Sequence, residues 1–159
     1  MSYNGIGRVK YIQIKAVIEL AKRISRTGFF KNNIKIKRPK DVYDLVYESY
    51  IGKKQEIIKT ILVNKSNNVI SVVTNSLGNV DSTSTSIKEI FSEPIKQMAS
   101  GIILVHNHPS GNTQPSNQDI KFTKFIKENG EIFGIKVLDH IIVADNGYTS
   151  LCENGYVNM

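Results

Sequence analysis

A polar segment, residues 106–119, follows a run of apolar residues and constrains the fold more than any other part of the chain. It reads His-Asn-His-Pro-Ser-Gly-Asn-Thr-Gln-Pro-Ser-Asn-Gln-Asp. His106 and His108 are two positions apart, Ser116 comes after seven intervening residues, and Asp119 comes after two more. Two nitrogen ligands and one oxygen ligand are a usual protein set for a catalytic zinc ion, whose fourth position holds water. The spacing therefore predicts a metal site made by His106, His108 and Asp119.

Both ends of this segment predict regular structure. Gly101 opens the run Gly-Ile-Ile-Leu-Val, which is typical of a buried strand. Residues i and i+2 of a strand point to the same face, so the two imidazoles can converge where the strand ends. Ser116 and Asp119 have the spacing of a capping box, which predicts a helix that starts at Ser116 with Asp119 at its third position. A purely structural interpretation of Asp119, as part of a helix cap, stays open at this point.

In this order the residues resemble the JAMM motif of the MPN metallopeptidases, and the longer strings resemble the RadC branch, a family once named for DNA repair. The matching strings are His106-Asn-His-Pro-Ser-Gly111, Pro115-Ser116 with Asp119, Gln55-Glu56, Ser86-Ile-Lys-Glu-Ile-Phe91, Leu138-Asp-His-Ile-Ile142 and Tyr148-Thr-Ser-Leu151. They extend from about Pro39 to Gly155. The resemblance implies a zinc metallopeptidase with one zinc ion per chain, which cleaves a peptide or isopeptide bond in a peptide or protein substrate.

The family also has an upstream glutamate that activates the attacking water. Four glutamates are within reach, and sequence order does not choose among them: Glu48, Glu56, Glu89 and Glu93. In the family this residue opens the first core strand, and Glu56 directly precedes the apolar segment 57–63, so the resemblance favours Glu56. Glu56 would act as base towards the water and then as acid towards the leaving amine. By the same resemblance Ser116 would help to hold the developing oxyanion, in addition to capping the helix.

Two other functions compete with this interpretation. One is a nucleic-acid-associated binding module that keeps the metal site but has no peptidase turnover. The other is an HNH nuclease, which the tripeptide His106-Asn-His108 suggests by its sequence. The residues of that nuclease motif are dispersed through a ββα unit, and the sequence does not supply the dispersed pattern. The metallopeptidase is therefore favoured over the nuclease.

Asp139 and His140 are candidates for a position behind the metal ligands, where carboxylates and similar groups orient ligand imidazoles. His140 precedes an apolar run and is equally well explained as a structural residue. Cys152 is the only cysteine, which excludes an internal disulfide and a cysteine-built zinc site. The chain has neither a run of about eighteen apolar residues nor a cleavable leader. We therefore expect a cytoplasmic protein with no membrane partner.

Positive charge is concentrated at the N-terminus. Residues 1–40 hold eleven Lys and Arg against one acidic residue, a net charge of +10, and the remaining residues carry −3, which gives +7 for the chain. Basic clusters are typical of nucleic-acid-binding surfaces, so DNA is an expected partner of this arm, and a solvated basic face is the alternative. The candidate contacts are Gly5, Gly7, Arg8, Lys10 and Lys15.

The glycines of this arm precede a helical pattern. Together they resemble the second half of a helix-hairpin-helix, in which a Gly-x-Gly loop leads into a helix whose amides bind a phosphate. Only four residues precede Gly5, so we expect the first helix of the hairpin to be missing and the N-terminus to be shortened.

We expect two units, a basic N-terminal arm over residues 1–34 and a RadC-type domain over residues 35–159. The domain is expected to be α/β, with the three-layer, cytidine-deaminase-like MPN/JAMM fold, a mixed sheet flanked by helices, and the short basic helical arm. A linker is predicted over residues 31–38, and Asn146-Gly147 predicts a tight turn. Helices are predicted near residues 12–26, 39–50, 86–99 and after Ser116, and strands near 56–64, 69–75, 101–105, 132–137 and 140–144.

Overall fold

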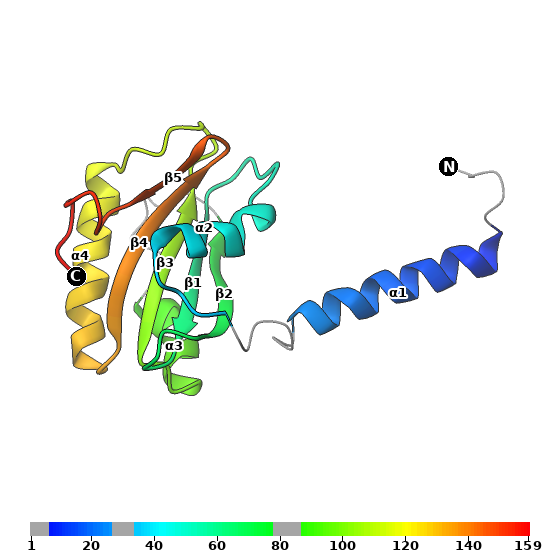
Figure 1. Cartoon of the computed structure of the whole chain (residues 1–159), viewed down its shortest axis with the longest axis horizontal. Helices are drawn as coiled ribbons and strands as arrows, with labels where there is room; N and C mark the ends of the chain where they lie inside the picture. Colours follow the sequence, from blue (N-terminus) through cyan, green and yellow to red (C-terminus); the bar gives the residue numbers. More distant parts are fainter. Residues whose placement is uncertain (1–6, 27–33, 78–86) are drawn as a thin grey trace.

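The computed structural model describes residues 7–26, 34–77 and 87–159, and within them a mixed sheet of five strands forms the centre (Figure 1). The strand order is β2-β1-β3-β4-β5. Strands β3 and β4 run parallel, and the other neighbouring pairs are antiparallel. The expected α/β architecture is confirmed. The strands are β1 (Ile57–Val63), β2 (Val69–Leu77), β3 (Gly101–Asn107), β4 (Lys136–Ala144) and β5 (Gly147–Ser150).

Helices cover both faces of this sheet. One face is covered by α2 (Pro39–Val46), which contacts β4 and β5 and continues into the short helix η1 (Tyr47–Ser49). The other face is covered by α3 (Ile87–Lys96) and α4 (Asn117–Ile132), which contact β2 and β4, respectively, and each other. These contacts give the three layers that the sequence predicts.

The two central strands are buried on both faces. Every residue of β1 and of β3 is buried, and along β1 alternate side chains enter two separate apolar clusters. Ile57 and Ile61 pack on the α2 side, whereas Ile58 and Leu62 pack on the side of α3 and α4. A polar side chain on β3 is therefore enclosed by protein, and it must find hydrogen-bond partners or a metal there.

One prediction was wrong: residues 132–144 do not form two strands. Helix α4 runs on to Ile132, Gly134 follows the C-cap with a positive φ of 67° that suits glycine, and a single strand, β4, comes next. The predicted break between the two strands lay at Leu138-Asp139. The strand instead continues through it with a bulge at Leu138, and the buried Asp139 carboxylate accepts a hydrogen bond from the Ser150 hydroxyl at 2.6 Å.

The N-terminal part also differs from the prediction. The predicted linker belongs to the body from Ile34 onwards, because the Ile34 carbonyl accepts from the Val69 amide and Ile36 is buried. Helix α1 (Arg8–Arg26) begins earlier than predicted, since the Gly7 carbonyl already accepts from the Tyr11 amide. Figure 1 shows α1 projecting away from the sheet. Among the described helices none has the length and the apolar composition needed to cross a bilayer.

Gly130, near the end of α4, lies where the helix meets the segment that leads into β4. Its carbonyl accepts from the amides of Phe133 and Ile135, which closes the turn. A Cβ atom at this position would lie 2.5 Å from the Ile135 carbonyl oxygen, which is backbone and cannot move away alone.

We therefore expect Gly130→Ala to destabilise the domain by about 1–3 kcal/mol through overpacking, in spite of the better helix propensity of alanine. The measurement is urea denaturation followed by circular dichroism. Glu128→Ala, on the same helix but exposed, is the control and should stay within about 0.5 kcal/mol of the wild type. Equal stability of the two variants would show that the backbone after Gly130 moves to accommodate the added methyl group.

Candidate metal centre

The two histidines of the central segment lie at the end of β3. His106 pairs with Ile58 of β1 and Ile142 of β4 and is fully buried. His108 follows the strand, and its N–H donates to the Val143 carbonyl at 3.0 Å, which continues the pairing with β4. The Nε2 atoms of His106 and His108 consequently lie 2.9 Å apart, as the period of two residues predicts.

Asp119 reaches the histidines from the first turn of α4. Ser116 is the N-cap: its hydroxyl oxygen accepts from the Asp119 amide at 3.1 Å, and its own amide donates to Asp119 Oδ2 at 2.7 Å. The capping box is confirmed. Oδ1 of the same carboxylate lies 3.2 Å from His106 Nε2, and Oδ2 lies 3.7 Å from His108 Nε2. Capping and metal binding thus do not compete for Asp119, because Ser116 bonds Oδ2 and leaves Oδ1 for the site.

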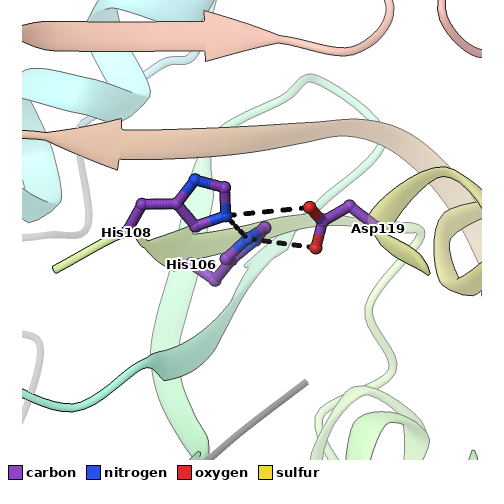
Figure 2. Close-up of side chains that lie close together, drawn as sticks. All are labelled: His106, His108 and Asp119. Carbon is purple, nitrogen blue, oxygen red and sulfur yellow. Dashed lines mark hydrogen bonds and ion pairs between the residues drawn. The ribbon is translucent and has the colours of Figure 1, made fainter. Parts of the chain in front are cut away.

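These three side chains have the geometry of a metal site. Figure 2 shows the two imidazoles and the carboxylate pointing towards one another. The three separations, 2.9, 3.2 and 3.7 Å, bracket the distance of about 3.3 Å expected between ligand atoms that lie about 2.0–2.1 Å from a tetrahedral ion. Imidazole and carboxylate ligands in this number suit first-row metals, zinc among them.

The charges of the site favour a cation. Burial alone would raise the pKa of Asp119, but hydrogen bonds with His106 and His108 hold the pKa well below its ordinary value. The carboxylate is therefore ionised at neutral pH. The hydrogen bond to Asp119 raises the pKa of His108, burial opposes that shift, and the Asn112 carbonyl and the charges of Asp119 and Glu56 add to it. A carboxylate held ionised beside two imidazoles is a ready ligand for a divalent ion.

Glu56 lies directly before β1, half-buried, and its charge acts on His108. Its backbone is held on both sides by one side chain. The Ile57 amide donates to Asn107 Oδ1 at 2.8 Å, and Asn107 Nδ2 donates to the Gln55 carbonyl at 3.1 Å. Asn107 is buried and stands between the two histidine ligands in the sequence, at the end of β3. It therefore ties the Glu56 segment to the strand that carries the metal ligands.

Sequence reasoning gave Asn107 no role. The available signal was an amide side chain in a strand that is otherwise apolar up to the first histidine, since a buried amide demands partners. Of the other three glutamates that were within reach, Glu93 bonds Lys96 and Gln97, Glu48 is exposed on η1, and Glu89 lies on α3.

Comparison with known families assigns the domain. The family model described as RadC-like JAB domain matches residues 36–156. The chain belongs to this RadC-like family. The RadC-like chain is 44% identical over 150 residues to a UPF0758 protein of Alkaliphilus metalliredigens, which covers 94% of the chain and 64% of that relative.

Two further relatives carry the same name. A UPF0758 protein of Clostridium tetani is 44% identical over 153 residues, covering 96% of the chain and 67% of the relative. One of Methanosarcina mazei is 38% identical over 157 residues, covering 99% and 68%. The RadC-like chain thus spans about two thirds of the length of these curated relatives.

The two predicted positions behind the ligands differ in where they lie. His140 touches the site, because its Nε2 atom is 2.8 Å from His106 Nδ1. Asp139 points away from it: its carboxylate accepts from the Ser150 hydroxyl and from the amides of His140 and Cys152. Burial raises the pKa of Asp139, whereas burial of His140 lowers the pKa of that ring well below its ordinary value. Because it accepts from Ser150 of β5, the Asp139 carboxylate links β4 to β5.

Three other predicted features are placed as follows. The Ser116 hydroxyl donates to Asp119 Oδ2 at 2.7 Å, so a role at an oxyanion requires that hydroxyl to turn. Arg8, Lys10 and Lys15 are exposed on α1, and Gly7 directly precedes that helix. Gly5 lies outside the described residues.

Asn107 makes two hydrogen bonds to the backbone on either side of Glu56, so removal of its side chain should lower the stability of the domain. Asn107→Ala leaves the Ile57 amide and the Gln55 carbonyl without this partner, which we expect to cost about 1–3 kcal/mol of stability in urea denaturation. Asn129→Ala is the matched control, since that side chain bonds only one carbonyl, that of Phe125, at 2.7 Å in an exposed position. A smaller loss of stability in Asn107→Ala than in Asn129→Ala would contradict the role of Asn107 in holding the Glu56 segment.

Proposed function

We propose that this RadC-like domain is a zinc-dependent hydrolase of the JAMM type, which uses an activated water molecule to cleave a peptide or isopeptide bond. The observation that carries the proposal is the convergence of three ligands with Glu56, whose charge acts on one of them. A structural zinc site has four protein ligands and needs no base beside it. Within the described residues the metal-binding group has three members, His106, His108 and Asp119, which leaves a position for water.

The chemistry divides between the ion and the chain. A zinc ion at the triad would bring the pKa of a bound water to about 7 and polarise the scissile carbonyl. Glu56 would take the proton of the attacking water and deliver it to the leaving amine, for which its place beside the ligands is suitable. Asn107 would keep Glu56 there. The Ser116 hydroxyl, once turned away from Asp119, would donate to the developing oxyanion.

A cavity beside His108 supports a substrate site next to the triad. It has a volume of about 380 Å³ and lies between η1, the loop that precedes β1, and the ends of β3 and β4. Its lining includes two tyrosines and two lysines, Tyr47, Tyr50, Lys53 and Lys54. A larger hollow of about 710 Å³ surrounds Gly101 at the opposite end of β3 and contains no member of the triad. The smaller cavity is therefore our candidate for the cleft that receives the substrate chain.

We expect wild-type protein loaded with zinc and dialysed to hold about one zinc ion per chain. Removal of a ligand in His108→Ala should abolish this content, whereas Glu56→Gln should keep it. Hydrolysis, screened with a library of internally quenched peptides and isopeptides, should be lost with the ion in the first variant and fall by about 10²–10⁴-fold in the second. Glu48→Gln, an exposed glutamate that was also within reach, is the control and should match the wild type in both measurements.

Three results would overturn parts of the assignment. Stoichiometric zinc in His108→Ala would remove the ligand set. A zinc-loaded wild type that cleaves no member of the library would favour the binding module without turnover. A Glu56→Gln variant as active as the wild type would refute Glu56 as the base.

We also propose that α1 binds nucleic acid. Arg8, Lys10 and Lys15 are exposed on this helix, and the helix has no acidic residue in its first turn. Exposed basic side chains gain affinity for phosphates by releasing counterions from the nucleic acid. A peptidase that is recruited to DNA through α1 would combine the two proposals.

Binding of duplex DNA, measured by fluorescence anisotropy, should weaken steeply as salt is raised. In the double variant Lys10→Ala/Lys15→Ala the slope of log affinity against log salt should become shallower by about 2, one for each lysine that no longer neutralises a phosphate. The control is Lys121→Ala/Lys124→Ala, the same change of charge at exposed positions of α4. Absence of binding by the wild type at low salt would refute the role of α1.

A further inference from the structure

Three buried side chains form a line of hydrogen bonds behind the metal centre. The Thr123 hydroxyl of α4 lies 2.6 Å from the Asp119 carbonyl and 2.5 Å from His140 Nδ1. On the other side of the His140 ring, Nε2 lies 2.8 Å from His106 Nδ1. Thr123, His140 and His106 are at most 1% exposed, so water does not compete for these bonds. The line joins α4, β4 and β3 at the level of the triad.

The direction of each bond follows from which atoms hold protons. A carbonyl oxygen can only accept, so the single hydroxyl proton of Thr123 points to Asp119. The Thr123 oxygen must then accept from His140, which places a proton on His140 Nδ1. Among the described residues the enclosed His140 ring hydrogen-bonds to Thr123 and His106 and to no carboxylate, and a neutral ring with its proton on Nδ1 has no proton on Nε2. With a metal ion bound, His106 must therefore donate from Nδ1, which leaves the lone pair of its Nε2 for the ion.

This line of hydrogen bonds keeps the proton of His106 on Nδ1, and a backbone carbonyl does the same for His108. His108 Nδ1 lies 2.6 Å from the Asn112 carbonyl, which only accepts and thereby keeps the proton away from the ligand nitrogen. His106 faces an imidazole instead, and an imidazole nitrogen can either donate or accept. Without Thr123 either direction would be open, and in the reverse one the proton of His106 would sit on Nε2, the atom that must bind the metal.

We propose that Thr123 and His140 are positioning residues that set the tautomer of His106 for metal binding. The inference rests on the metal site of the proposed function and not on turnover. In this proposal Asp119 has two roles: its carboxylate is a metal ligand, and its backbone carbonyl accepts from the Thr123 hydroxyl and so fixes the direction of that bond.

Histidine tautomers can be read directly, because the chain has three histidines and each belongs to the site. In protein labelled with ¹⁵N at histidine, two-bond ¹H–¹⁵N correlations show which ring nitrogen holds the proton. In the zinc-loaded wild type we expect protons on Nδ1 of all three rings and a bare Nε2 on His140. A His140 ring protonated on Nε2 would overturn the proposal. This spectrum needs no substrate and no variant.

Thr123→Val removes the hydroxyl and keeps the shape of the side chain, and Thr123→Ser keeps the hydroxyl. Zinc affinity, measured by competition with a chromophoric chelator, should fall by about 10–100-fold in Thr123→Val and stay at the wild-type value in Thr123→Ser. The His140 signals of Thr123→Val should show both tautomers. Wild-type affinity in a folded Thr123→Val, or equal losses in the two variants, would overturn the role of the hydroxyl.

These outcomes separate the inference from the proposed hydrolase. A protein that binds zinc through the predicted tautomers but cleaves nothing would leave the line of hydrogen bonds intact and refute only the enzyme. If the wild type hydrolyses a substrate and Thr123→Val binds zinc as tightly as the wild type, the enzyme would be supported and the role of Thr123 refuted.

Discussion

The start of α4 at the end of β3 is the constraint on which the site depends. The capping box ties the Asp119 carboxylate to Ser116, and this fixes the carboxylate against two imidazoles that the strand periodicity has already placed on one face. Neither half suffices alone, because a strand end presents nitrogen ligands without charge and a helix cap presents a carboxylate without partners. Their meeting turns two ordinary local structures into a charged, buried pocket for a cation.

The surrounding fold supplies rigidity to this meeting point. β3 is the middle strand of the sheet, paired on both sides and buried along its whole length, so His106 cannot leave its place without disturbing β1 or β4. The antiparallel partner β1 is preceded by Glu56, and the parallel partner β4 carries His140. Glu56, the proposed base, and His140 therefore reach the site through the two neighbours of one strand. This explains how groups far apart in the sequence are brought together at one site.

Local sequence patterns were enough for the parts of the site that are local. The spacing of His106 and His108 follows from strand geometry, and that of Ser116 and Asp119 from helix capping, so both pairs were predictable. The partners Asn107 and Ile57 are 50 residues apart, and His106 and His140 are 34 apart; these contacts depend on strand order and register. The bulge at Leu138 shows the same limit, because without Ser150 the polar residue Asp139 resembles a strand end.

The buried polar groups behind the site argue for a metal centre rather than a helix cap alone. A cap needs Ser116 and Asp119 and nothing more, and burying His106, His140 and Thr123 together costs free energy unless every donor finds an acceptor. In the described residues no buried side-chain nitrogen or oxygen lacks a partner. Each donor behind the site therefore has an acceptor, and the proposed proton directions leave the lone pair of His106 Nε2 aimed at His108 and Asp119. Because replacing such a buried polar network by an apolar core is often neutral or stabilising, the arrangement favours a site whose lone pair a cation would accept.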